Sequence, residues 1–230
     1  MTDSPPVSLV WLFDIDGTLL LTQGAGRDAL VLALRDHFGV HDELEGIRFS
    51  GRTDPVIVAD VLARHGLSFG DDEPLWWSRV TEHMRRLMDP PRGGLLAGAA
   101  EVLQGVAAEP AWVSTLLTGN VSEMAKIKLE SFGVWERFAF GTFGEEGADR
   151  DDLARLAVRR AVERFGIAPA QCVIVGDTEH DVACARAAGA TAVAVATGNR
   201  TREQLGACAP DLLLDDLTAS RVLLEWAKRL

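Results

Sequence analysis

The chain has 230 residues, of which 47% are hydrophobic and 25% charged, the proportions of a globular protein with a packed core. This length fits one domain with an inserted subdomain better than two full domains. The formal net charge of −11 argues against nucleic acid as a stable partner and against anionic membrane surfaces, and an anionic substrate would need a local cation to offset it.

The N-terminal part predicts one buried strand followed by a helical insertion. Ser8–Phe13 is a short, continuous apolar run, which is typical of a strand buried on both faces. The segment from about Gly24 to Pro91 shows helical patterns with no convincing strand between them, and glycines and prolines at its two ends favour hinges. The expected helices of this insertion are Asp28–Phe38, Asp54–His65 and Glu73–Met88.

From residue 92 onward, apolar strands alternate with helices. The expected strands are Ala111–Leu117, Cys172–Val175, Ala192–Val195 and Asp211–Leu214. The expected helices are Ala97–Ala107, Ser122–Ser131, Asp151–Phe165, Asp181–Ala188 and Thr201–Ala207. This alternation predicts an α/β fold, in which a Rossmann-like parallel sheet is covered by helices on both faces. Residues 1–22 and 92–230 would form the core, and residues 23–91 an α-helical cap inserted after the first strand.

Cysteine usage and the lack of long apolar runs predict a cytoplasmic location. Cys172, Cys184 and Cys208 are odd in number and flanked by apolar residues, which favours buried free thiols in a reducing compartment. Val7–Phe13 is too short for a secretory signal and has no basic flank. No run approaches the ~18 apolar residues of a membrane span.

Two carboxylates directly follow the first strand, in the motif Asp14-Ile15-Asp16-Gly17-Thr18. Ligands of open parallel sheets bind at the carboxyl ends of the strands, so chemistry is expected at this position. The same residue types also favour a tight turn with a cap, so the motif is not decisive alone.

Two further polar motifs follow later strands. Thr118-Gly119-Asn120 combines a hydroxyl with adjacent backbone amides, which suits an oxyanion cradle as well as an ordinary helix N-terminus. Asp177 lies at the end of another strand, with Asp181 one helical turn further on. Clustered carboxylates repel unless a cation compensates them, and hard oxygen ligands favour Mg²⁺ over zinc.

These motifs, in this order, resemble the haloacid dehalogenase superfamily. The similarity is to its phosphatase branch with a helical cap after the first strand, the phosphoglycolate phosphatase-like proteins, and it extends from Val7 to Leu217. The matching motifs are Asp14–Thr18, Thr118, Gly176-Asp177 with Asp181, and the cap sequence Gly51-Arg52-Thr53-Asp54.

The resemblance implies a Mg²⁺-dependent phosphatase acting on a small phosphorylated metabolite, with phosphoglycolate as the first guess. Asp14 would attack phosphorus and form an aspartyl-phosphate, while Asp16 would protonate the leaving oxygen and then activate water. The metal would be held by the carboxylates of Asp14 and Asp177 and the backbone carbonyl of Asp16, with support from Asp181. The expected phosphate-binding residues are Gly17, Thr18, Thr118, Gly119 and Asn120.

One family motif is altered. The family's third motif carries a lysine, but the corresponding stretch Gly144–Asp152 has none. Arg150 is the only cation at about the right place, and Lys128 on the helix after Thr118 is the competing candidate. In the cap, Arg52 could reach a substrate anion or form a surface salt bridge, and the pair Trp76-Trp77 is expected to pack inside the cap.

Other functions remain in competition. A phosphomutase keeps both aspartates, so the motifs do not separate it from a phosphatase. A 2-haloacid dehalogenase resembles this chain without the second acid, and Asp16 therefore argues against one. The altered third motif leaves room for a catalytically degenerate binding or regulatory module. Neither the substrate nor the oligomeric state follows from the sequence.

Overall fold

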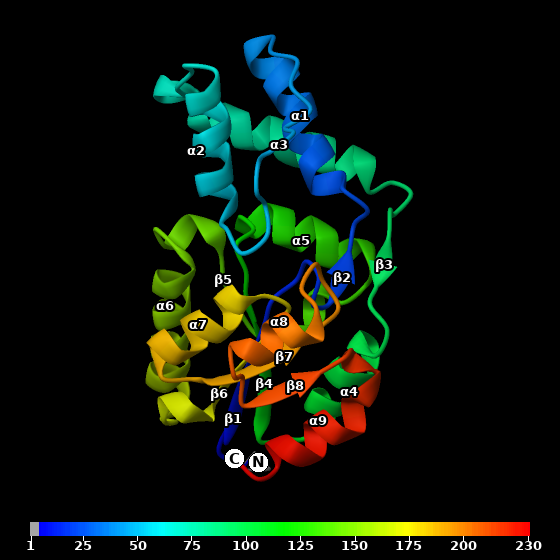
Figure 1. The fold of residues 1–230 in the computed structure, drawn as a ribbon, viewed down its shortest axis with the longest axis vertical. Coiled ribbons are helices and arrows are strands. Elements are labelled where there is room, and N and C mark those ends of the chain that lie inside the picture. Colours follow the sequence, from blue (N-terminus) through cyan, green and yellow to red (C-terminus); the bar gives the residue numbers. More distant parts are fainter. Residues whose placement is uncertain (1–4) are drawn as a thin grey trace.

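A six-stranded parallel sheet forms the lower half of the molecule in the computed structural model, which describes residues 5–230 (Figure 1). The strand order is β5-β4-β1-β6-β7-β8. The strands are β1 (Leu9–Phe13), β4 (Trp112–Leu117), β5 (Gly141–Thr142), β6 (Cys172–Gly176), β7 (Thr191–Val195) and β8 (Leu212–Leu214). The central strand β1 pairs in parallel with β4 and β6. The predicted α/β class is confirmed.

Helices cover both faces of the sheet and bury every residue of β1. Trp11 and Phe13 point into the cluster beneath α4, α5 and α9, whereas Val10 and Leu12 point into the cluster beneath α6, α7 and α8. Successive strand residues face opposite sides, so a strand covered twice must be apolar throughout. The helices are α4 (Ala99–Ala108), α5 (Ser122–Ser131), α6 (Arg150–Phe165), α7 (Glu179–Ala188), α8 (Arg202–Ala207) and α9 (Ser220–Ala227).

The start of α6 is set by a side-chain cap. The carboxylate of Asp149 accepts a hydrogen bond from the backbone N–H of Asp152 at 2.9 Å, which satisfies one of the free donors of the first turn. The helix therefore begins at Arg150, one residue before the predicted start. It ends before Gly166, whose φ of 70° is the left-handed conformation that glycine adopts most readily. Arg150 is thus fixed at the first helical position, facing the sheet edge.

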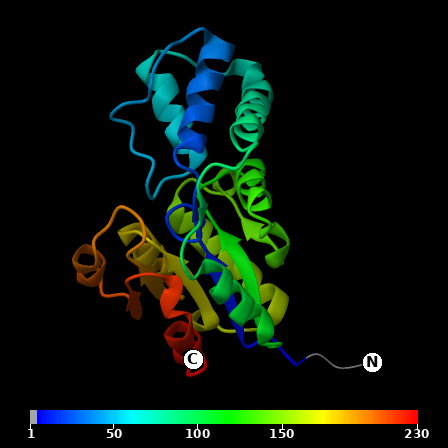
Figure 2. The ribbon, with the colours of Figure 1, turned by 90° about the vertical axis from the view of Figure 1, so that its right-hand side faces the viewer.

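Three further helices form a lobe beyond the carboxyl edge of the sheet (Figures 1 and 2). They are α1 (Ala25–Phe38), α2 (Asp54–Arg64) and α3 (Glu73–Leu87). Their shared cluster includes Leu34, Val61 and Trp76 and extends to Met124 of α5. Trp76 is buried, as predicted, whereas Trp77 is only half buried and lines a cavity. The lobe therefore has its own apolar core, which rests on α5.

A short antiparallel ribbon joins this lobe to the sheet. Its strands are β2 (Leu20–Leu21) and β3 (Gly94–Leu95). The backbone at Gly93 has a φ of 86°, and an added Cβ would lie 1.8 Å from the carbonyl oxygen of Leu21. Only glycine fits at position 93, because the two connecting segments run side by side and approach closely there.

Two of the three cysteines are buried, as the sequence predicted. Cys172 and Cys184 are free and buried, and burial raises the pKa of both thiols to about 12. Cys208 is free but only partly covered, so the prediction of burial holds for two of the three. Within residues 5–230, no helix has the length and apolar character needed to cross a membrane.

Candidate active site

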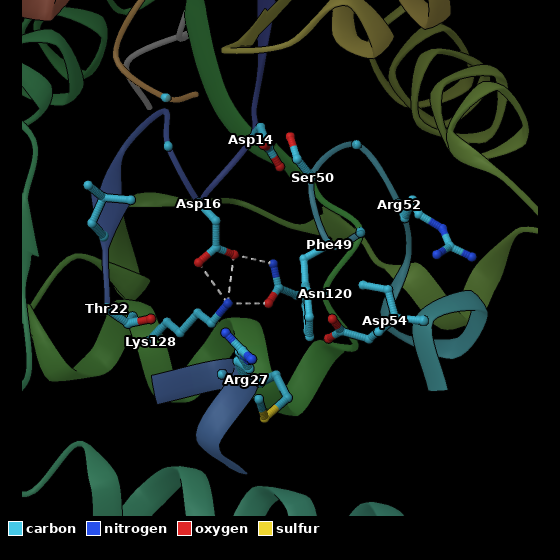
Figure 3. Close-up of a pocket in the computed structure, with 18 of the residues that line it drawn as sticks. Asp14, Asp16, Thr22, Arg27, Phe49, Ser50, Arg52, Asp54, Asn120 and Lys128 are labelled. Carbon is cyan, nitrogen blue, oxygen red and sulfur yellow. Dashed lines mark hydrogen bonds and ion pairs between the residues drawn. The ribbon is translucent and has the colours of Figure 1, made fainter. Parts of the chain in front are cut away.

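The predicted site residues meet at the carboxyl edge of the sheet, facing the helical lobe. Asp14 follows β1, Thr118 follows β4 and Asp177 follows β6. A cavity of about 430 Å³ opens between this edge and the lobe, and Asp14, Asp16 and Asp177 line it (Figure 3). The parallel strands thus bring together residues that lie far apart in the chain.

Three carboxylates form a cluster at the sheet end of the cavity. Oxygen atoms of Asp14, Asp177 and Asp181 all lie within 4.8 Å of one another. Burial raises the pKa of Asp14 to about 6, against the opposing charge of Arg150. Burial and the neighbouring carboxylate of Asp14 raise the pKa of Asp177 to about 8. Without a cation the cluster would therefore retain protons near neutral pH.

Arg150 contacts Asp14 directly. Its Nη2 atom lies 3.1 Å from Oδ1 of Asp14 and 2.5 Å from Oδ1 of Asp181. Burial opposes the guanidinium charge, but the two carboxylates outweigh it and hold the pKa of Arg150 well above its usual value. Of the two candidates for the altered third motif, Arg150 is the one that contacts Asp14.

Asp181 is held by its own helix terminus. Its Oδ2 accepts hydrogen bonds from the backbone N–H of Thr178 at 3.1 Å and from the hydroxyl of Thr178 at 2.7 Å. Its Oδ1 is engaged by Arg150. An added Cβ at Gly176 would lie 2.1 Å from Cγ of Asp181, so the strand end has no room for a larger residue. Asp181 is therefore well placed to orient Arg150, and a direct ligand role for it stays a prediction.

Lys128 lies on the other side of the site and contacts Asp16. Its Nζ atom is 2.8 and 2.6 Å from the two carboxylate oxygens of Asp16 and 2.5 Å from Oδ1 of Asn120 (Figure 3). The Nδ2 atom of Asn120 donates to Oδ2 of Asp16 at 2.7 Å and to Oγ1 of Thr118 at 2.8 Å. This network holds the Asp16 carboxylate in one orientation and links it to Thr118.

The loop after β7 packs against Asp177, and none of its residues was among the predicted site residues. An added Cβ at Gly198 would lie 1.7 Å from Oδ2 of Asp177, and one at Gly17 would lie 2.6 Å from the same atom. The hydroxyl of Thr197 donates to the carbonyl of Gly17 at 2.6 Å. The position of Thr197-Gly198 at the carboxyl end of a predicted strand was a usable signal for this loop.

The segment before α2 brings the helical lobe against the core. The backbone N–H of Asp54 donates to the carbonyl of Gly119 at 2.7 Å, and its Oδ2 accepts from the N–H of Val121 at 2.9 Å. Burial raises the pKa of Asp54 to about 6, although the nearby charge of Lys128 opposes the shift. The sequence analysis gave Asp54 no role of its own, because a buried contact between two lobes leaves no local pattern.

Arg52 does not reach the phosphate side of the cavity. Its Nη2 lies 2.6 Å from the carboxylate of Asp60, and its Nη1 donates to the carbonyl of Arg48 at 3.2 Å. In Figure 3 its guanidinium points away from Asp14 and Asp16. The sequence left two alternatives for Arg52, a contact with a substrate anion or a surface salt bridge, and the structure shows the salt bridge.

The donor atoms of the cluster fit a hard divalent cation. Asp14, Asp177 and Asp181 offer only carboxylate oxygens, and Mg²⁺ prefers such ligands. The close approach of Gly17 and Gly198 to Asp177 fixes that carboxylate toward the cluster. Burial and repulsion between neighbouring carboxylates raise the pKa values of Asp14 and Asp177, and a bound cation would oppose both effects.

Comparison with known proteins agrees with this geometry. Residues 152–220 match the family described as "HAD-hyrolase-like", the hydrolases of the haloacid dehalogenase type. A probable phosphatase, IndB, of Dickeya dadantii is 29% identical over 212 residues, covering 89% of this chain and 88% of that protein. A phosphoglycolate phosphatase of Xanthomonas campestris is 30% identical over 203 residues, covering 82% and 83%.

A solved structure shares the fold. The crystal structure of CbbY from Rhodobacter sphaeroides in complex with phosphate superimposes with a TM-score of 0.73 and 22% identity, covering 91% of this chain and 94% of that one. The chain belongs to the haloacid dehalogenase superfamily of hydrolases. Within it the protein is a phosphatase of the phosphoglycolate phosphatase-like branch.

Proposed function

We propose that this phosphatase hydrolyses a phosphate monoester of a small metabolite through an aspartyl-phosphate on Asp14. The observation that carries the proposal is the Asp14 carboxylate, which lies beside Arg150 in a cluster of buried acids. Arg150 can neutralise part of the phosphoryl charge, as the family's lysine does. Phosphoglycolate is the first ester to test, because several relatives are phosphoglycolate phosphatases.

The two half-reactions use Asp14 and Asp16. An oxygen of Asp14 attacks phosphorus, the bond from phosphorus to the ester oxygen breaks, and Asp16 gives that oxygen a proton. Asp16 then takes a proton from water, whose oxygen attacks the phosphorus of the aspartyl-phosphate; the bond from phosphorus to the Asp14 oxygen breaks, which releases phosphate and restores the carboxylate. Oγ1 of Thr118 accepts hydrogen bonds from the backbone N–H and from Nδ2 of Asn120. Thr118, with the amides of Gly119 and Asn120, would bind phosphoryl oxygens.

A divalent cation belongs to this proposal. Asp14, Asp177 and the backbone carbonyl of Asp16 would hold Mg²⁺, and the ion would supply charge neutralisation for the incoming phosphate dianion. Asp181 supports the same site through Arg150. Residues 23–91 act as the cap, whose loop around Arg52 meets the core at Gly119.

The experiment is a phosphatase assay on p-nitrophenyl phosphate and phosphoglycolate, with EDTA and then with added Mg²⁺. We expect turnover only with the metal and its loss, by at least about 10³-fold, in Asp14→Asn. Asp215→Asn, on the exposed surface, is the matched control. Acid quenching with labelled substrate should capture a phosphoprotein from the wild type. Metal-dependent turnover that survives Asp14→Asn would contradict the mechanism.

A further inference from the structure

The cavity above Asp14 has a polar floor and largely apolar walls. Leu30, Ile57, Val80 and Met124 are buried side chains that line it, and Phe49 and Trp77 are half-buried ones. All except Met124 come from the helical lobe. A volume of about 430 Å³ lies within the roughly 300–1,000 Å³ of pockets for drug-sized ligands. This space exceeds what the two-carbon acid of phosphoglycolate would fill.

The cations that line the cavity already have partners. Arg150 contacts Asp14 and Asp181, as described above. Lys128 is paired with Asp16, and Arg52 with Asp60. Nε of Arg27 donates to the backbone carbonyl of Glu43 at 2.9 Å. Arg27 contacts only this neutral carbonyl, so among the described lining residues it is the one cation without a carboxylate partner.

A carboxylate on the leaving group would have Arg27 as its single available partner. Its charge would lose water on entering a cavity that already contains the carboxylates of Asp16 and Asp54. Burying a charge without a partner is costly, whereas an apolar group gains free energy from the same walls. The chemistry of the walls thus favours an uncharged, apolar leaving group.

We propose that the substrates of this enzyme are phosphate monoesters whose leaving alcohol carries an uncharged, apolar group of about the size of one ring, packed against Trp77 and Phe49. The inference rests on the proposed function and specifies its substrate class. The chemistry is unchanged: Asp14 attacks phosphorus and the bond to the alcohol oxygen breaks. Only the part of the alcohol that lies beyond this oxygen differs.

The test compares three esters whose leaving oxygen is bound to a primary carbon: ethyl phosphate, 2-phenylethyl phosphate and phosphoglycolate. We expect kcat/KM for 2-phenylethyl phosphate to exceed the values for the other two by about tenfold or more, because the ring is buried with the transition state. Binding of 2-phenylethyl phosphate and ethyl phosphate to the Asp14→Asn variant, measured by calorimetry, should show the same order.

Wall variants separate this preference from a general effect on activity. Trp77→Ala should lower the ratio of kcat/KM for 2-phenylethyl phosphate over ethyl phosphate several-fold. The substitution removes an apolar side chain that lines the cavity and leaves the carboxylates around Asp14 unchanged. Leu75→Ala lies on the same helix but is exposed and outside the cavity, so it should leave the ratio unchanged.

Two results would overturn the inference alone. One is equal kcat/KM for the three esters, and the other is a preference for phosphoglycolate that is lost in Arg27→Met. Both leave the proposed phosphatase mechanism intact. Failure of the wild type to hydrolyse any ester in the presence of Mg²⁺ would instead overturn the proposed function, and the inference with it.

Discussion

Lys128 and Asn120 hold the carboxylate that is proposed to move the protons. Two of the three polar contacts of the Lys128 ammonium are to Asp16, and its side chain is almost fully buried. A general acid contributes about 10²–10⁴-fold only when its proton is aimed at the leaving oxygen. Lys128 is therefore a positioning residue for Asp16 and is distinct in role from Arg150.

We expect Lys128→Met to lower kcat by about 10–100-fold with a much smaller change in KM, because Asp16 loses its orientation while the phosphate contacts remain. Lys126→Met is the matched control, since Lys126 is partly exposed on the same helix and pairs with Glu130 at 3.9 Å rather than with a site residue. Steady-state kinetics on one ester measures both values. An equal effect of the two substitutions would contradict the role of Lys128.

The sequence was sufficient to predict which acids meet, but not which cation accompanies each. Asp14, Asp16 and Asp177 follow buried strands, and parallel topology brings strand ends together whatever the loops do. The partner of a carboxylate depends instead on helix rotation and on side-chain conformation. Arg150 and Lys128 both lie near the site, and only the orientations of α5 and α6 assign them to different aspartates.

At the scale of elements, segments with a clear apolar pattern could be predicted and the shortest elements could not. The predicted helix Ser122–Ser131 coincides with α5, and the five predicted strands differ from the observed ones by no more than a residue at each end. The two-residue strands β2, β3 and β5 are too short to show any periodicity, and their pairing arises from neighbouring segments. Helix α9 at the chain's end was not predicted.

The loop after β7 should control the metal affinity of the site. In Gly198→Ala the added Cβ would lie 1.7 Å from Oδ2 of Asp177, so this carboxylate must move. We expect the Mg²⁺ concentration for half-maximal activity to rise by about tenfold, in line with the cost of disturbing groups that orient a ligand. Gly206→Ala is the control, because its Cβ would meet only Leu213 at 3.5 Å. An unchanged metal dependence would argue against Asp177 as a ligand.

The carboxylate cluster should also make stability depend on pH. The pKa values of Asp177 and Asp14 are raised to about 8 and about 6 from an unfolded value of 3.8. Between about pH 4 and pH 8 the folded state therefore binds more protons than the unfolded state, and stability falls as the pH rises.

We expect the Tm of the metal-free protein to fall from about pH 5 to about pH 8, and Asp177→Asn to flatten this slope. Added Mg²⁺ should raise Tm strongly near pH 8 and little near pH 5, because protons compete for the same oxygens. Scanning calorimetry with and without EDTA measures both effects. A Tm that rises with pH in EDTA would contradict the raised pKa values.

At the scale of the whole molecule, one loop docks the cap onto the core at two glycines. An added Cβ at Gly119 would lie 2.2 Å from the carbonyl oxygen of Arg52, and one at Gly51 would lie 2.0 Å from Cδ2 of His180. The contact between Asp54 and the amide of Val121 adds a hydrogen bond at the same place. These contacts between the cap loop and the core therefore set the distance between the cavity walls and Asp14.

We expect Gly119→Ala to push the cap loop outward and lower kcat/KM by about tenfold or more, since small displacements of a substrate reduce the rate steeply. Gly94→Ala is the control, because its Cβ would meet nothing within 4 Å. Kinetics together with Tm separates a displaced cap from a destabilised fold. Normal kcat/KM in Gly119→Ala would show that this contact does not set the geometry.

The position of the insertion also has a consequence for protein engineering. The two clusters that stabilise the sheet include no residue of α1, α2 or α3, so these helices could be exchanged for others without redesign of the core. On the core side, the buried residues that share the cluster of the lobe are Val121, which directly precedes α5, and Met124 and Ile127 of α5. A chimera that carries a foreign segment between the strands of the ribbon, with these three positions matched to it, should keep the chemistry and acquire a new substrate range.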